Sequence, residues 1–241
     1  MSSARKVFAV ALLAALAWVV ATTAEAQPPI RIGASLAQTG LYAALGQNQL
    51  RGYQLCVKHM NDKGGVLGRK LALVVHDDGF DPATAVRLYE TLITQDKVDL
   101  VLGPYSSFIT DAVADVTEKH KIPMVAPAAS ATSIYRKGRK FIFSTQPPAE
   151  VYLEGLLDLA AKKGLKTVAL INRDGPFGRA VIQGAIELVN KKGLQVVFAD
   201  AYPPGTTDFS AILTKVRAAN PDVLGGEIGR ASCRERVCQY V

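Results

Sequence analysis

Two short stretches of this sequence place hydroxyl side chains among small residues, where an apolar run gives way to a segment with helical spacing. The first stretch, residues 103–107, reads GPYSS and follows the apolar run at 98–102. A helix that starts here directs backbone N–H groups near Ser106 outward, and their partial positive charge suits a carboxylate or a phosphate. The hydroxyl of Ser107 adds a donor without adding a charge. We therefore expect an anion-binding site at this helix start.

The second stretch, residues 126–132, reads APAASAT. Its residues are small enough for a ligand to touch the main chain, and Ser130 supplies a second hydroxyl. The carbonyl of Ala128 is an acceptor of the kind that an ammonium group needs. Donors for an anion beside an acceptor for a cation are what a zwitterion requires. A plainer interpretation stays open, in which Ser106 or Ser107 is only a helix N-cap and the second stretch is only a tight loop.

Other kinds of chemistry lack a pattern in this sequence. The histidines His59, His76 and His120 show no HxxxH or HExxH spacing, so no metal site is predicted. The nucleophile elbow GxSxG and the phosphate-binding patterns GxGxxG and GxxxxGK(S/T) are absent. Asp77 and Asp78 could form an acid or metal pair, but such a pair more often caps a strand end or orients a loop. We predict a protein that is not an enzyme and holds no cofactor.

Short apolar runs alternate with amphipathic segments along the body of the chain. Because the strand-like runs lack a polar face, this alternation predicts an α/β fold in which parallel sheets lie between helices. Ligands bind such sheets at the carboxyl ends of the strands, which here lead into residues 36–46, 76–80, 103–107 and 126–132. The predicted strands are 30–35, 70–77, 98–103, 123–126, 141–145, 167–172, 195–199 and 222–225. The predicted helices are 42–63, 82–96, 106–120, 149–164, 176–192 and 207–219.

The composition changes at residues 144–148, STQPP, and this divides the body into two units of the size of an α/β lobe. The first lobe covers residues 27–145, and the second covers residues 146–226. The second lobe holds only three predicted strands. We therefore expect it to be incomplete and the protein to be truncated at its C-terminus.

The first 26 residues have the order of a secretory signal peptide. Arg5 and Lys6 precede an apolar run at 7–21, and the small-residue pattern AEA ends at Ala26. The run is shorter than the roughly 20 residues that span a bilayer, so cleavage after Ala26 is expected rather than a membrane anchor. The mature protein is predicted to be periplasmic or secreted.

The last residues, 227–241, are predicted to be a non-native tail. Cys233 and Cys238 lie five apart without a histidine, which fits no zinc spacing. Residues 228–237 can be back-translated into a common short-read sequencing adapter. This leaves Cys56, flanked by Leu55 and Val57 in a predicted helix, and it is expected to be a small buried hydrophobe.

The charge of the chain gives no sign of nucleic acid as a partner. The formal net charge is +7, of which +4 remains once residues 1–26, with a charge of +1, and residues 228–241, with a charge of +2, are set aside. No stripe of Lys and Arg with interleaved aromatic residues is present, so a nucleic-acid surface is not predicted. The basic run at 136–140 is expected to be a solvated loop between the lobes.

Five stretches, taken in order, resemble a known family. They are IRIGASLAQTGLYAALGQNQLRGYQL, NDKGGVLGRKLALVVHDDGFDP, VLGPYSS, PMVAPAASA and ALINRDGPFGRA, and they are spread over most of residues 30–226. The chain is similar to extracytoplasmic solute-binding proteins of ABC transporters, of the leucine/isoleucine/valine-binding type I periplasmic family. The resemblance implies a two-lobed type I periplasmic-binding fold that closes on a small solute like a hinge. It also implies a monomer that delivers the solute to a membrane ABC permease.

The resemblance also assigns roles to residues of this sequence. Ser107 and Ser130 would bind the carboxylate of an amino acid or amino-acid-like solute. The main chain of Ala128, with Ala129 and Ser130, would receive the amino group. Tyr105 and Ser106 would line the first-lobe wall, and Phe177 would close over the ligand as an aromatic lid from the second lobe.

This sequence departs from the pattern of that family at its C-terminal side. The family has an aromatic residue directly after the Gly-Gly at 225–226 and an acidic residue further on, whereas Glu227 stands at the first position. The nature of the solute side chain is therefore open among aliphatic amino acids, amides, urea-like compounds and aromatic acids. Two other functions stay open: the ligand-sensing domain of a receptor or regulator on the same fold, and an exported hydrolase. The hydrolase is disfavoured because no nucleophile–base pair is present.

Overall fold

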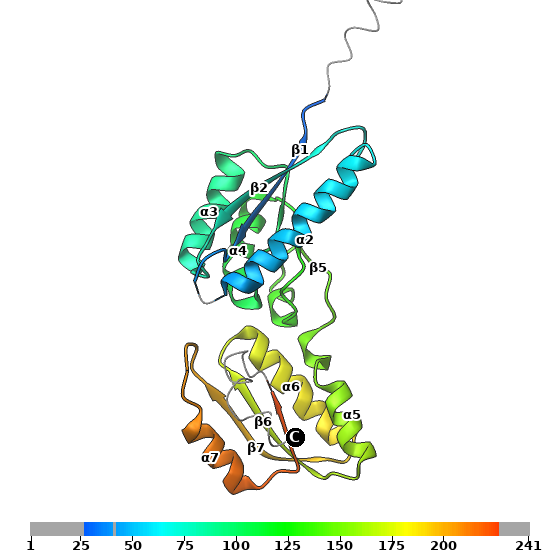
Figure 1. Cartoon of the computed structure of the whole chain (residues 1–241), viewed down its shortest axis with the longest axis vertical. Coiled ribbons are helices and arrows are strands. Elements are labelled where there is room, and N and C mark those ends of the chain that lie inside the picture. The colour runs from blue at the N-terminus through cyan, green and yellow to red at the C-terminus, as the bar shows by residue number, and fades with distance from the viewer. Residues whose placement is uncertain (1–26, 41, 227–241) are drawn as a thin grey trace, which may run out of the picture.

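The computed structural model of the protein describes residues 27–40 and 42–226, which form two separate parallel sheets (Figure 1). The first sheet has five strands in the order β2-β1-β3-β4-β5, and the second has three in the order β7-β6-β8. The strands of the first sheet are β1 (Ile30–Leu36), β2 (Leu71–Asp77), β3 (Leu100–Leu102), β4 (Met124–Ala126) and β5 (Ile142–Ser144). Those of the second are β6 (Thr167–Arg173), β7 (Gln195–Tyr202) and β8 (Val223–Gly226). The predicted α/β fold with two parallel-sheet lobes is confirmed.

Helices cover both faces of the first sheet. The chain leaves β1 in one direction along the sheet and leaves β3 in the other, so right-handed crossovers put their helices on opposite faces. On one face, Tyr53 packs with Ala34 and Leu36 of β1. On the other face, Tyr89 and Val113 join the largest apolar core of the molecule. The helices are α2 (Ala43–Asp62) on the first face, and α3 (Pro82–Thr94) and α4 (Ser107–His120) on the second.

The second sheet is built in the same way on a smaller scale. Leu157 and Val189 pack on one face of β6, and Ile212 and Val216 pack on the other. The helices are α5 (Glu154–Lys162), α6 (Pro176–Lys191) and α7 (Ser210–Ala219), and the short 3-10 helices are η1 (Thr132–Ile134) and η2 (Ala149–Val151). In the part of the chain that the structure describes, none of the helices combines the length and the apolar character needed to cross a membrane.

Local signals in the sequence set most of the element boundaries. Asp81 caps α3 by accepting a hydrogen bond from the Thr84 amide at 2.6 Å, and Pro82 occupies the first helical position.

One prediction was wrong in detail, because the segment 149–164 is divided into η2 and α5 rather than forming one helix. The predicted signal peptide and the predicted tail at 227–241 lie outside the described residues.

The two lobes share a packed interface. Ala180 and Val181 of α6 and Ala149 of η2 belong to the same buried apolar cluster as the residues of α3 and α4. The backbone of α6 passes so close to η2 that a Cβ on Gly184 would lie 2.0 Å from the carbonyl oxygen of Glu150. Only glycine permits this approach, so α6 and η2 form one tightly packed unit, and the shared apolar cluster seats this unit on the first lobe.

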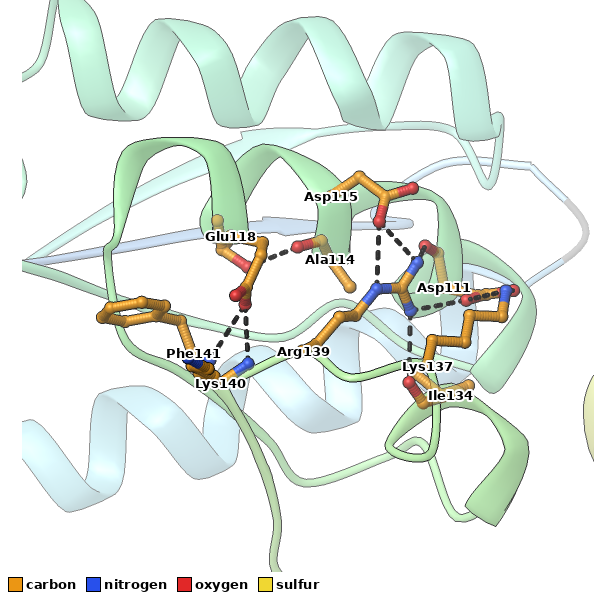
Figure 2. A network of polar contacts seen from close by, with 10 residues as sticks. Asp111, Ala114, Asp115, Glu118, Ile134, Lys137, Arg139, Lys140 and Phe141 are labelled. Atoms are coloured by element: carbon orange, nitrogen blue, oxygen red, sulfur yellow. Dashed lines mark hydrogen bonds and ion pairs between the residues drawn. The ribbon is translucent and has the colours of Figure 1, made fainter.

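The basic run at 136–140 is exposed at four of its five positions, as expected, but it does not lie free between the lobes, because Arg139 anchors it to the first lobe. Figure 2 shows the guanidinium of Arg139 lying against α4, inside the first lobe, where it donates to Asp111 at 2.7 Å and to Asp115 at 2.8 Å. Its side chain is only 6% exposed, and Lys137 also bonds to Asp111. A planar fork of donors can serve two carboxylates one helical turn apart, so this run anchors the segment before β5 to α4.

Cys56 is likewise not a buried hydrophobe, because it is exposed. The buried residues of α2 are Gly46 and Tyr53, which lie on one narrow face of the helix. Cys56 follows Tyr53 by three positions, and the rotation of the helix carries its thiol out of the contact with the sheet.

We predict that Arg139→Met will lower the free energy of unfolding by about 2–3 kcal/mol at pH 7. The change leaves the partly buried Asp111 with Lys137 as its remaining cationic partner, so the cost is below the roughly 3–5 kcal/mol of breaking a fully buried pair. Urea unfolding measures the loss. Arg136→Met, at an exposed position of the same loop, is the matched control and should change stability by less than about 0.5 kcal/mol.

The pH dependence of the same variant provides a second check. Burial acts to raise the pKa of Asp111, but hydrogen bonds from Lys137 and Arg139 outweigh it and hold the pKa below its ordinary value of 3.8. The stabilisation is therefore fully present above pH 3.8 and is lost as the pH falls through the lowered pKa. The difference between wild type and Arg139→Met should shrink over that interval, and a difference that stays constant would contradict the proposed pairing.

Candidate ligand-binding cleft

The two stretches that the sequence singled out lie side by side at the carboxyl ends of β3 and β4. The amide of Ser106 donates to the carbonyl of Ala128 at 3.1 Å. The amide of Ala131 in turn donates to the hydroxyl of Ser107 at 3.2 Å. Because these strands are neighbours in a parallel sheet, their following loops meet at one edge and hold each other in place.

Two backbone features show how closely these loops approach. A Cβ on Gly103 would lie 2.9 Å from the Cα of Ala126, so the turn after β3 has room only for glycine. Ser106 adopts φ +80°, a conformation that is strained for any residue with a side chain. Strained residues of this kind gather at binding sites, where the surrounding contacts enforce them.

The start of α4 provides a donor set, with one difference from the expectation. The amide of Ser106 is already bonded to Ala128, and its hydroxyl caps the helix by accepting from the Ile109 amide at 3.5 Å. The next amides, of Ser107 and Phe108, belong to the first turn, where a helix has no internal acceptors for its N–H groups. The Ser107 hydroxyl accepts from Ala131 and keeps its own proton to donate.

These groups line a cavity of about 270 Å³ between the two lobes. Ser107 and Ser130 are 1% and 4% exposed, so a bond to either of them is shielded from water. Six of the seven residues that the sequence selected line this cavity, and the exception is Ala129. Ala129 is fully buried, and its carbonyl accepts from the Tyr135 hydroxyl at 2.5 Å. The six are Tyr105, Ser106, Ser107, Ala128, Ser130 and Phe177.

Aromatic rings form much of the first-lobe wall. Tyr42 and Phe80 are stacked with ring centroids 3.9 Å apart and an interplanar angle of 26°. Tyr105 lies 6.2 Å from Tyr42, and Phe108 lies 6.4 Å from Phe80, both tilted. The loops after β1 and β2 thus complete the wall that the loops after β3 and β4 begin.

The second lobe contributes rings and a cation from the opposite side. Phe177, in the first turn of α6, forms an edge-to-face pair with Tyr152 at 5.5 Å. Arg173, at the end of β6, donates a hydrogen bond to the hydroxyl of Tyr42 in the first lobe. Its guanidinium carbon also lies 5.5 Å from the centre of the Tyr42 ring. The two lobes are therefore joined at the cavity itself.

The sequence had signals for some of the residues that it did not select. Tyr42 and Phe80 follow the first and second strands, so the strand-end rule pointed to their loops without selecting these side chains. The same rule, applied to the second lobe, leads to Arg173 at the end of β6. No local signal indicates Tyr152, because it enters the cavity only through the packing of the segment that joins the lobes.

A larger cavity of about 540 Å³ lies beside the first and shares five lining residues with it, Phe108, Asp174, Gly175, Pro176 and Pro204. Its lining includes the Arg139 network and also Asp174 and Arg179, which pair with each other. These charges are already matched within each lobe. We regard this space as the outer mouth of the cleft.

Asp77 and Asp78 orient the loop after β2, as the plainer interpretation of this pair held. Asp77 accepts from the amides of Gln38 and Gly79 at 2.8 and 3.0 Å. Asp78, 3% exposed, accepts from the Ser35 hydroxyl at 2.7 Å and from the Phe80 amide at 2.9 Å. Among the described residues, no group of three or more His, Cys, Asp or Glu side chains could hold a metal ion.

Comparison with known proteins agrees with this architecture. The sequence profile of the family described as periplasmic binding protein matches residues 29–233. The Leu/Ile/Val-binding protein BraC3 of Rhizobium johnstonii is 31% identical over 224 residues, which are 91% of this chain and 59% of that relative. The chain thus spans well under two thirds of the length of this relative.

Solved structures give the same picture. A solute-binding protein of an ABC transporter from R. palustris, in complex with 4-hydroxybenzoate, has a TM-score of 0.74 and 27% identity. The match covers 81% of this chain and 53% of that one. The branched-chain amino acid binding protein LivJ of Streptococcus pneumoniae, in complex with isoleucine, has a TM-score of 0.70 and 26% identity, with 81% and 56% covered.

The pKa values of Asp78 and Asp77 are shifted in opposite directions, so the two residues should change the pH dependence of stability in opposite ways. Burial raises the pKa of Asp78 above its ordinary 3.8, and hydrogen bonds from Ser35 and Phe80 only partly offset it. The stability that Asp78 contributes is therefore lost as the pH rises through the raised pKa. We expect the free energy of unfolding of Asp78→Asn, relative to wild type, to increase as the pH rises from about 4 to 7. Asp78→Ala should cost about 1–3 kcal/mol, because Ser35 and Phe80 lose their acceptor.

Asp77→Asn is the matched control in the same loop. Burial opposes ionisation here too, but hydrogen bonds from Gly79, Thr39 and Gln38 hold the pKa of Asp77 below 3.8. Its contribution is present above pH 3.8 and is lost as the pH falls, so this variant should move in the opposite direction. Urea unfolding across the pH range measures both variants. The same slope for both would refute the assignment.

Proposed function

The chain belongs to the periplasmic binding protein family, whose members bind solutes and are not enzymes, and we propose that it is the extracytoplasmic solute-binding component of an ABC importer. In this role it captures a small solute that carries a carboxylate, an amino acid or amino-acid-like compound, in the cavity between its lobes. It then delivers the solute to a membrane permease.

One observation carries this proposal. The cavity is lined from both sheets by residues that follow strand carboxyl ends, and its first-lobe side combines the α4 helix start with the hydroxyls of Ser107 and Ser130. These groups can donate hydrogen bonds to an anion, although none of them carries a formal positive charge. Hydrogen bonds to an ionised partner contribute about 1.5–3 kcal/mol each, so a few of them provide much of the roughly 8 kcal/mol of micromolar binding.

The opposite wall accounts for capture. Phe177 and Arg173 reach the cavity from the second lobe, and Arg173 contacts Tyr42 of the first lobe, so the lobes are closed in this arrangement. A hinge rotation away from it admits the solute, and the return rotation encloses it. A hinge closure that depends on the solute gives the permease a shape to distinguish the loaded protein from the empty one. The chemistry of the relatives' solutes is consistent with this, since isoleucine and 4-hydroxybenzoate both carry a carboxylate.

We predict that Ser107→Ala and Ser130→Ala each weaken binding of the solute by roughly 1.5–3 kcal/mol, because each removes a hydroxyl donor to a buried carboxylate. The measurement is isothermal titration calorimetry on the full-length protein, after a thermal-shift screen of amino acids, amides and aromatic acids has identified the solute. Ser133→Ala, at an exposed serine of η1 in the same lobe, is the control and should bind like wild type.

Two results would contradict the proposal. Unchanged affinity in both site variants would remove the carboxylate assignment. Failure of any carboxylate to raise the melting temperature, with a well-folded protein, would remove the solute-binding function itself.

A further inference from the structure

Three tyrosine hydroxyls donate to main-chain carbonyls of the two loops that contain Ser107 and Ser130. They belong to Tyr53, Tyr89 and Tyr135. Resting on the proposed function, we propose that these tyrosines are positioning residues, whose hydroxyls hold the two loops in their binding arrangement before a solute arrives. None of these three side chains is among the residues that line the cavity, so they act through the main chain of the loops.

Two of the hydroxyls meet at the end of β3, from opposite faces of the first sheet. Tyr53 of α2 donates to the carbonyl of Gly103 at 2.8 Å. Tyr89 of α3 donates to the carbonyl of Leu102 at 2.6 Å. The pairing of β3 with β1 ends at Val101, so both carbonyls lie beyond it. Carbonyls past the end of a ladder need other donors, and here side chains from both neighbouring layers supply them.

These bonds lie directly before the strained part of the first loop. Ser106 follows Gly103 by three positions and has φ +80°. A residue in that region keeps its conformation only where the surrounding contacts enforce it. The amide of Ser106 also donates to the carbonyl of Ala128 in the second loop at 3.1 Å. A shift at the end of β3 would therefore disturb the contact between the two loops.

The third hydroxyl acts on the second loop. Tyr135, directly after η1, donates to the carbonyl of Ala129 at 2.5 Å. Ala129 is fully buried and lies between Ala128 and Ser130, both of which line the cavity. Each loop thus has its main chain fixed close to the groups that meet the solute. Support of this kind, from residues behind the binding groups, is what preorganises a site.

The hydroxyls, rather than the rings, carry this role. Tyr53 and Tyr89 are 9% and 0% exposed, and a phenylalanine ring would fill the same space in the apolar core without a polar group to desolvate. Burial raises the pKa of all three tyrosines above its ordinary value of 10.0, so each hydroxyl keeps its proton and remains a donor. Loops that are already fixed lose less conformational entropy on binding.

Hydrogen exchange of main-chain amides, measured by NMR on the full-length protein without a solute, tests the inference. The informative amides are those of Ser106 and Ala131, because both donate hydrogen bonds from one loop to the other. In Tyr53→Phe and Tyr89→Phe their exchange rates should rise at least about fivefold, the ratio that corresponds to the loss of a typical hydrogen bond. Tyr135→Phe should have the same effect at Ala131.

Thr117→Val is the matched control. Thr117 is fully buried in α4, and its hydroxyl donates to the carbonyl of Ala114 at 2.9 Å, so this variant also removes one buried hydroxyl donor from the first lobe. The lost bond lies within the helix and away from both loops. Because local openings depend on local contacts, the exchange rates of Ser106 and Ala131 should stay within about twofold of wild type.

Two results would overturn the inference. One is unchanged exchange at Ser106 and Ala131 in the folded tyrosine variants. The other is an equal rise in Thr117→Val, which would show that the hydroxyls affect only the overall stability. A thermal melt confirms that each variant is folded. Tyr135 is only partly buried, so its variant preserves the test if a change at Tyr89 prevents folding.

The experiment separates this inference from the proposed function, because no solute is added. Unchanged loop exchange would overturn the positioning role and leave the solute-binding function standing. Failure of every carboxylate in the thermal-shift screen would remove the solute-binding function, and with it the purpose of the positioning, whatever the exchange rates are.

Discussion

The close packing of helix α6 on the segment that joins the two sheets fixes how the halves of the cavity face each other. Gly184 allows the backbone of α6 to touch Glu150, and Ala180 and Val181 are buried with side chains of the first lobe. Phe177 lies one helical turn before Ala180 and Val181. Its place opposite the serines of the first lobe therefore depends on an apolar interface and on one missing Cβ.

The same joint is connected to the ligand loops by hydrogen bonds. The carbonyl of Ser130 accepts from the Ala149 amide at 2.9 Å, and the hydroxyl of Thr132 donates to Glu150. A displacement of the second lobe would thus shift the loop that contains Ser130. Because packed interfaces move between discrete arrangements rather than deforming continuously, this connection suits a protein that reports occupancy by closing.

Two sets of contacts hold the cavity lining in place, and each set faces a different part of a solute. At the end of β3, the strained Ser106 and the bond between Ser107 and Ala131 fix the polar donors. At the ends of β1 and β2, Asp78 and the stacked rings fix the apolar wall. The polar end selects a charge that many solutes share. The wall then distinguishes among them by shape.

The eight strands, the parallel fold and the two hydroxyl-bearing loops could all be predicted from the sequence, because apolar runs, glycine stops and strand-end serines are local properties of the chain. The sequence did not predict that Arg139 is buried or that Cys56 is exposed, because the burial of a side chain depends on which other elements pack against it. Only the tertiary structure brought Tyr42, Phe80, Arg173 and Tyr152 to the same cavity. These residues come from four separate segments, and no pattern along the chain encodes the distance between such segments in space.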